Sequence, residues 1–179
     1  MIRILGAVLA GGRSSRFGSD KAMATWRDTA LIDHALASLS PHVADLLVVG
    51  RADARVRTAP DLPYPELGPL GGIAGALEVA AREGFDAVLT TACDTPRLPP
   101  ALVAALLGED AAHAAEAPTV GLWPVRLAAP LLARLSAGGD RSIRGWARDT
   151  GAVAVLPGVV LANVNTPDDL ARLDGAVRG

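Results

Sequence analysis

A segment near residue 11 gathers positive charge around adjacent glycines. Gly11 and Gly12 follow an apolar run, and Arg13, Arg16 and Lys21 come within the next nine residues. Backbone amides beside glycine approach an anion closely, so the segment suits a triphosphate. Its spacing matches neither the P-loop nor the dinucleotide-binding pattern. The only lysine among sixteen arginines lies here, which favours a role for a compact ammonium over a solvated loop of ordinary surface cations.

Asp94 comes directly after a second apolar run at residues 87–91. An unpaired carboxylate beside a buried strand would be costly, and Mg²⁺ bound together with substrate phosphates would compensate its charge. The alternative is a turn residue before Pro96. The neighbouring Cys93 is interpreted as a small buried residue rather than as a nucleophile.

Asn163 and Asn165 are the only asparagines in a chain that has no glutamine. Residues two apart on a strand share a face, so both amides would point the same way with Val164 opposite. An uncharged amide both donates and accepts hydrogen bonds, which suits the edge of a heterocycle or a phosphate. The alternative is turn chemistry before a helix capped by Thr166 and begun by Pro167.

Apolar strands and amphipathic helices alternate along the chain and would position these three segments. Strands are predicted at residues 4–9, 46–49, 87–91, 119–123, 152–156 and 161–164, and helices at 31–39, 71–82, 100–107, 127–135, 142–148 and from 166. Residues 108–118 are ambiguous between a loop, a weak edge strand and a helix end. The alternation indicates an α/β fold with a mostly parallel sheet and helices on both faces. Ligands of such sheets bind beyond the carboxyl ends of the strands, so the three segments are expected at one edge.

Length and composition exclude several classes of protein. The chain has 179 residues, is 50% hydrophobic and carries a net charge of −2, with a mean hydropathy of +0.31. These values predict a single domain over residues 1–179 and give no reason to expect nucleic acid or a membrane as a partner. One cysteine excludes a disulfide framework. No apolar stretch is long enough to span a bilayer, and a cytoplasmic protein is expected.

Five blocks, in this order along the chain, resemble the molybdenum cofactor guanylyltransferases, the MobA-like branch of the nucleotidyltransferases. The blocks are Leu9-Ala10-Gly11-Gly12 through Asp20-Lys21-Ala22, Gly68-Pro69-Leu70-Gly71-Gly72, Cys93-Asp94-Thr95-Pro96, Ala117-Pro118-Thr119-Val120-Gly121-Leu122 and Asn163-Val164-Asn165-Thr166-Pro167. The resemblance implies a three-layer α/β/α, Rossmann-like nucleotidyltransferase fold. It also implies transfer of GMP from Mg-GTP to molybdopterin that carries molybdenum.

The resemblance also assigns roles to individual residues. The nucleotide would be contacted by Leu9, Ala10, Gly11 and Gly12, its phosphates would be bound by Lys21 and Arg16, and its guanosine would be held by Asp61. Asp94 would bind Mg²⁺ and position the phosphates, so that Lys21, Arg16 and Asp94 form the catalytic set. Asn163 and Asn165 would lie near the reacting centre or on the acceptor side. A cofactor-delivery protein or an apo-molybdoenzyme would be a further partner.

The sequence departs from the family at three places, and these leave alternatives open. Gly50-Arg51-Ala52-Asp53 stands where many members have an asparagine, Ala117 stands where histidine is frequent, and residues 108–116 form a shortened segment. A cytidylyltransferase acting on molybdopterin or on another small acceptor is one alternative. A nucleotide-binding module without turnover, serving cofactor delivery, is the other.

Overall fold

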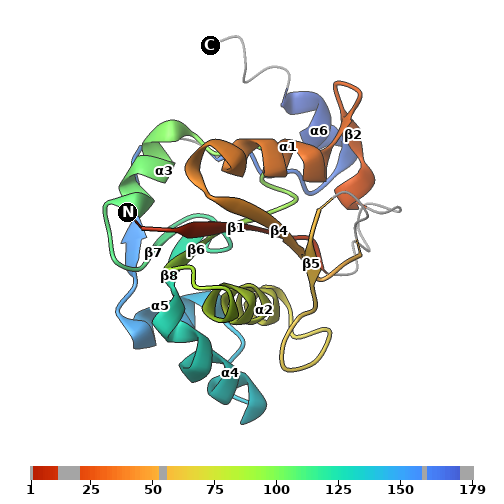
Figure 1. Ribbon diagram of the computed structural model, residues 1–179. Helices are drawn as coiled ribbons and strands as arrows, with labels where there is room; N and C mark the ends of the chain where they lie inside the picture. Colours follow the sequence, from red (N-terminus) through yellow and green to blue (C-terminus); the bar gives the residue numbers. More distant parts are fainter. Residues whose placement is uncertain (1, 12–20, 53–55, 159–160, 174–179) are drawn as a thin grey trace.

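The computed structural model describes residues 2–11, 21–52, 56–158 and 161–173 (Figure 1). These residues form a seven-stranded sheet with helices on both faces, and a separate two-stranded hairpin. The strands are β1 (Ile4–Leu9), β2 (Thr25–Trp26), β3 (Thr29–Ala30), β4 (Asp45–Val49), β5 (Thr58–Ala59), β6 (Ala87–Ala92), β7 (Ala112–Ala114), β8 (Gly121–Pro124) and β9 (Val153–Val155). The α-helices are α1 (Leu31–Leu39), α2 (Pro69–Arg82), α3 (Pro100–Leu107), α4 (Ala128–Ser136), α5 (Ile143–Thr150) and α6 (Pro167–Arg172).

The sheet has the order β5-β4-β1-β6-β8-β7-β9. β5, β4, β1 and β6 pair in parallel, β8 runs antiparallel to both of its neighbours, and β7 and β9 pair in parallel. Only β8 is therefore reversed among the strands of this sheet, and the expectation of a mostly parallel α/β sheet is confirmed.

Apolar side chains on both faces of the central strand explain the three layers. Leu5, Ala7 and Leu9 of β1 pack with α2, α4 and α5, whereas Val8 packs with α1 and α3. Figure 1 shows the same division, with α1 and α3 on one side of the sheet and α2, α4 and α5 on the other. Because successive side chains of a strand point to opposite faces, a strand covered by helices on both sides becomes a continuous apolar run.

A third, smaller cluster fixes the last helix. Trp26 of the β2–β3 hairpin and Leu31 at the start of α1 pack against Val164 and Leu173, and all four side chains are buried. This cluster brings the segment before α6 next to residues that follow β1 in the sequence. It therefore links two of the three segments that the sequence singled out.

The winding of the chain creates a switch point beside β1. After β1 the chain moves outward to β4 and β5, then returns to form β6 on the other side of β1. Loops that leave the carboxyl ends of β1 and β6 diverge at such a point, which is where open α/β sheets bind ligands. The segments that begin at Ala10 and Cys93 flank it.

Three features of the fold differ from the sequence predictions. The prediction of a strand at residues 161–164 is wrong. Among the described residues this segment joins no ladder, and Val164 N–H donates to Asp94 O at 2.8 Å. The hairpin β2–β3 and the strand β5 were not predicted, because strands of two residues carry no readable periodicity. The ambiguous segment 108–118 contains β7.

Candidate active site

Lys21, Asp94 and Asn165 meet at the switch point. Lys21 Nζ lies 3.2 Å from Asp94 Oδ2 and 3.1 Å from Asn165 Oδ1. The Lys21 side chain is 13% exposed and that of Asp94 is 28% exposed, so their ion pair is partly shielded from water. The expectation that the three segments converge is met for these three residues.

The main chain around Asp94 is held on both sides. Cys93 N–H donates to Leu9 O at 3.2 Å, which continues the pairing of β1 with β6, and Val164 N–H donates to Asp94 O. Thr95 Oγ1 donates to Asp94 Oδ1 at 3.3 Å, while the other carboxylate oxygen takes the lysine ammonium. Each carboxylate oxygen has lone pairs left for a further cation or donor.

Asn165 is positioned by the capping box of α6. The Asp169 carboxylate accepts from the N–H groups of Asn165 and Thr166, both at 2.9 Å, and Thr166 Oγ1 accepts from Asp169 N–H at 3.2 Å. The hydrogen bond from the Asn165 N–H is the largest cause that lowers the pKa of the Asp169 carboxyl below its ordinary value, and the hydrogen bond with the Thr166 side chain is the next. The cap that starts the helix therefore also fixes the backbone that carries the amide.

The two asparagines occupy different positions in the site. Asn163 and Asn165 are both exposed, and Val164 between them is fully buried against the hairpin. The alternation predicted for a strand is thus kept by an irregular segment. The amide of Asn165 accepts the hydrogen bond from Lys21, and Asn163 lies two residues farther along the same segment.

Asp61 lies among glycines on the other side of β1. A Cβ atom on Gly50 would lie 3.1 Å from Asp61 Oδ1 and 2.6 Å from Gly11 Cα, and Gly50 has a φ of +84°. A Cβ on Gly72 would lie 3.5 Å from the same carboxylate oxygen. Burial raises the pKa of the Asp61 carboxyl above its ordinary value. Glycines of the loops after β1 and β4 and of the first turns of α2 therefore lie close to this carboxylate.

The glycines of α2 bring that helix directly onto the segment before Asp61. A Cβ atom on Gly75 would lie 2.1 Å from Pro60 O, closer than any real contact of this kind. Gly68, with a φ of +73°, turns the chain into α2, and Pro69 occupies its first position. The glycine-rich block that sequence analysis used only for its resemblance therefore has a packing reason.

Some of the expected site residues lie outside the described part of the chain. Gly12 and Arg16, which were expected to contact the nucleotide and its phosphates, are among residues 12–20. Of the others, Leu9 ends β1 and is buried, Ala10 is half-buried and Gly11 is exposed. Ala10 N–H donates to Val49 O at 2.9 Å, which ties the start of this loop to β4.

Two residues that sequence analysis did not single out support the site. Thr95 donates a hydroxyl to Asp94, and Asp169 holds the backbone of Asn165. The spacing of Thr166 and Asp169 is that of a capping box, and this signal was present in the sequence. The hydroxyl of Thr95 had no such signal, because its role depends on the turn after β6.

The donor set fits a metal that arrives with phosphate ligands. Within the described ranges, no group of three or more histidine, cysteine, aspartate and glutamate side chains is arranged to hold a metal ion. Asp94 offers a carboxylate at the switch point, next to the ammonium of Lys21. Mg²⁺ is commonly bound by one or two carboxylates together with substrate phosphates, so Asp94 suits such an ion.

No helix in the described part of the chain is long and apolar enough to cross a membrane.

Comparisons with known proteins agree with this geometry. The molybdenum cofactor guanylyltransferase of Cereibacter sphaeroides is 37% identical over 191 aligned positions, which cover 99% of this chain and 98% of that protein. The protein of the same name from Rhodobacter capsulatus is 36% identical, with the same coverage.

Solved structures share the fold. The molybdopterin-guanine dinucleotide biosynthesis protein A of Archaeoglobus fulgidus superposes with a TM-score of 0.72 at 23% identity, covering 97% of this chain and 98% of that one. The 2-C-methyl-D-erythritol 4-phosphate cytidylyltransferase of Thermus thermophilus gives a TM-score of 0.71 at 17% identity, covering 99% of each chain. The model of the MobA-like NTP transferase domain matches residues 6–156, so the chain belongs to this family of nucleotidyltransferases.

Proposed function

We propose that the chain transfers GMP from Mg-GTP to the terminal phosphate of molybdopterin carrying molybdenum, with release of pyrophosphate. The observation that carries the proposal is the meeting of Lys21, Asp94 and Asn165 at the switch point. The naming of full-length relatives as molybdenum cofactor guanylyltransferases supports the choice of GTP and of the acceptor.

The reaction needs no nucleophile from the protein. An oxygen of the acceptor phosphate attacks the α-phosphorus of GTP and forms a new P–O bond. The bond from that phosphorus to the oxygen bridging the α- and β-phosphates breaks, and the electron pair leaves with pyrophosphate. Catalysis then consists of positioning and of neutralising charge on the phosphates.

The described residues suit these tasks. The ammonium of Lys21 would bind triphosphate oxygens, and Arg16 would add charge from the same loop. Asp94 would hold Mg²⁺, which supplies charge neutralisation on the phosphates when bound. Lys21 donates to oxygens of Asp94 and Asn165, and phosphate oxygens are acceptors of the same kind.

The guanosine would lie on the β5 side of β1, near Asp61. A carboxylate accepts hydrogen bonds only, and guanine offers a ring N–H and an amino group on one edge. Gly11 and Gly50 have no side chains, so their backbones approach the carboxylate closely. Leu9, Ala10, Gly11 and Gly12 would provide the adjoining backbone. Asn163 and Asn165 would face the acceptor.

Calorimetric titration with each of the four Mg-NTPs tests the nucleotide. We expect GTP to bind most tightly, and Asp61→Asn to reduce its advantage over the other three. Tighter binding of CTP than of GTP would overturn the guanylyl assignment. Pyrophosphate release with GTP and molybdenum-loaded molybdopterin then tests turnover, and its absence in a chain that binds GTP would indicate a binding module.

A further inference from the structure

The ion pair between Lys21 and Asp94 joins two groups that the proposed function gives to opposite ligands. Lys21 would bind the anionic phosphates, and Asp94 would bind the metal cation. In the structure the ammonium lies 3.2 Å from Asp94 Oδ2, and the two side chains are only 13% and 28% exposed. Each group therefore has the other as its counter-ion, and the partial shielding from water strengthens their attraction.

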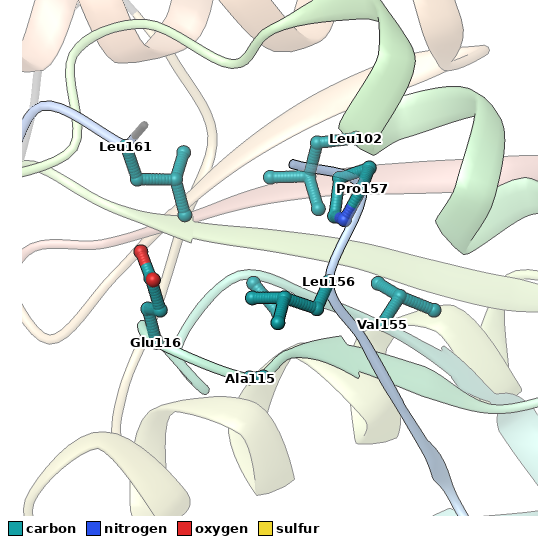
Figure 2. Close-up of a pocket in the computed structure, with 8 residues that line it drawn as sticks. Leu102, Ala115, Glu116, Val155, Leu156, Pro157 and Leu161 are labelled. Carbon is teal, nitrogen blue, oxygen red and sulfur yellow. The ribbon is translucent and has the colours of Figure 1, made fainter. Parts of the chain in front are cut away.

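Asn165 supplies a second acceptor for the same ammonium, and its position is fixed. Its Oδ1 lies 3.1 Å from Lys21 Nζ. The segment that carries it begins at Leu161, which packs into the apolar cluster around α3 and lines the small depression shown in Figure 2. Val164 is fully buried, and Asp169 accepts from the Asn165 N–H. The amide is thus held by its segment, whereas a lysine side chain has a flexible four-carbon stem and can move its ammonium.

The carboxylate of Asp94 is held as well. Thr95 Oγ1 donates to Asp94 Oδ1 at 3.3 Å, and Thr95 is buried. In the described part of the chain, the cation that pairs with this carboxylate is Lys21. A metal ion that arrived at Asp94 alone would meet the positive charge of the ammonium. A triphosphate that arrived at Lys21 alone would meet the negative charge of the carboxylate, and like charges at such short range repel strongly.

Building on the proposed function, we propose that the Lys21–Asp94 pair makes the site specific for the triphosphate together with its metal, against either component alone. When both ligands bind, one ion pair is exchanged for two, because phosphate oxygens take the ammonium and the metal takes the carboxylate. Neither side chain then faces an uncompensated like charge. Lys21 and Asp94 are specificity-determining residues through their contact with each other, in addition to the contact of each with its own ligand.

Mn²⁺ is the probe for the metal alone, because it accepts the same oxygen ligands as Mg²⁺ and is detected by electron paramagnetic resonance. Lys21→Met removes the ammonium and keeps a long, flexible side chain. Without nucleotide, we expect this variant to bind Mn²⁺ about tenfold more tightly than wild type. Adding Asp94→Asn to Lys21→Met should abolish the gain. Arg82→Met, at an exposed arginine in the last turn of α2, makes the same change in net charge and should bind Mn²⁺ as wild type does.

GTP in the presence of EDTA is the probe for the triphosphate alone. Asp94→Asn keeps the shape of the side chain and removes the charge that repels phosphate. We therefore expect metal-free GTP to bind Asp94→Asn about tenfold more tightly than wild type in a calorimetric titration. With Mg²⁺ present the order should reverse, since an amide is a poorer metal ligand than a carboxylate. Asp168→Asn, at an exposed carboxylate at the start of α6, is the matched control and should leave both affinities unchanged.

These measurements separate the inference from the proposed function. The Mn²⁺ comparison involves no nucleotide, so equal Mn²⁺ affinity of wild type and Lys21→Met would overturn the inference even in a chain that turns over GTP. Metal-free GTP that binds Asp94→Asn no more tightly than wild type would overturn it too. A chain that binds none of the four Mg-NTPs would defeat the proposed function instead. Melting curves establish that each variant is folded, and Lys21→Gln, which also removes the charge, repeats the test if Lys21→Met does not fold.

Discussion

Two carboxylates at opposite ends of the sheet's carboxyl edge, Asp61 and Glu116, stand in contrasting surroundings. Asp61 follows the edge strand β5 and lies close to the backbone of Gly11, Gly50 and Gly72. Glu116 follows β7 beside the opposite edge strand and borders leucine side chains. The contrast lies in what surrounds them, main chain on one side and side chains on the other.

That difference predicts that the two regions tolerate amino-acid substitutions to different degrees. A wall made of glycine backbone cannot be altered by substitution without adding atoms where none fit, whereas a wall of partly exposed leucines can be changed one side chain at a time. The region around Asp61 should therefore resist substitution, and the region around Glu116 should accept it.

The largest effect is expected at Asp94, which lies between the two sides. Asp94→Asn keeps the shape and the hydrogen bond from Thr95 but removes the charge that faces Lys21 and the proposed Mg²⁺. We expect kcat to fall about 100-fold or more, equivalent to roughly 3 kcal/mol. Steady-state pyrophosphate release measures this, with the exposed Asp168→Asn as control. Near-wild-type turnover at ordinary magnesium concentration would make Asp94 a turn residue.

Two glycine substitutions test the contrast in packing directly. Gly75→Ala places a Cβ 2.1 Å from Pro60 O, so α2 or the segment before Asp61 must shift, at a cost of about 1–3 kcal/mol. Gly108→Ala, at the C-terminal end of α3, meets its nearest atom at 3.5 Å and should change stability by less than about 1 kcal/mol.

Thermal melting of both variants and GTP titration of Gly75→Ala measure these effects. The first variant should lose several degrees in Tm and also lose GTP affinity. Equal melting temperatures for the two variants would show that the contact between α2 and Pro60 tolerates an added Cβ as well as the end of α3 does.

Lys21→Arg tests whether the proposed phosphate site requires the compact shape of an ammonium as well as its charge. The ammonium of Lys21 fits between two oxygens at 3.2 Å and 3.1 Å, whereas guanidinium is planar and larger. We expect kcat/KM to fall about tenfold, equivalent to roughly 1.4 kcal/mol, and Lys21→Ala to lose more.

The melting temperature should change little for Lys21→Arg, which keeps a positive charge opposite Asp94, and should fall for Lys21→Ala, which removes the ammonium from that carboxylate. An arginine variant as active as wild type would show that charge alone matters. The single lysine in a chain of arginines would then have no functional meaning.

The smallest effect concerns pH and the cap of α6. Hydrogen bonds from the backbone of Asn165 and Thr166 depress the pKa of Asp169, so its carboxylate stabilises the folded state at neutral pH. Because the folded-state pKa is the lower one, this contribution is lost as pH falls through it, below the ordinary value of 3.8. Amide exchange of Asn165 and Thr166, corrected for its intrinsic dependence on pH, should lose protection there. In Asp169→Asn the same amides should show no such transition, and a transition that persisted would assign it to another group.

Sequence predicted the elements that a long apolar run and a clear stop define. The bounds of β1, α1 and α3 agree with those predicted, because Gly11 and Gly12 end the first run, Pro41 follows the first helix, and Pro100 begins the third. A strand was wrongly predicted at residues 161–164 because Ala162 and Val164 are apolar. They pack in the cluster with the hairpin, and the Val164 N–H bonds to Asp94 O; in the described residues the segment pairs with no strand. Periodicity reports burial and does not report the partner.

The candidate site divides in the same way. The meeting of Lys21, Asp94 and Asn165 followed from one rule, that carboxyl ends of parallel strands share an edge. Asp61 was reached only through family resemblance, since the two-residue strand before it gives no pattern.

The hydrogen bond from Lys21 to Asn165 has a consequence for synthesis of the chain. The two residues are 144 positions apart, and ribosomes add roughly 5–20 residues per second, so roughly 7–30 s pass between their additions. During that interval the nascent chain can pair β1 with β4 and later with β6, and the ammonium has the carboxylate as its partner before the amide exists. A ribosome that stalls within the last helix thus carries a chain with the Lys21–Asp94 ion pair and without the hydrogen bond from Lys21 to Asn165. Nucleotide affinity measured on stalled chains would report when each of these two contacts forms.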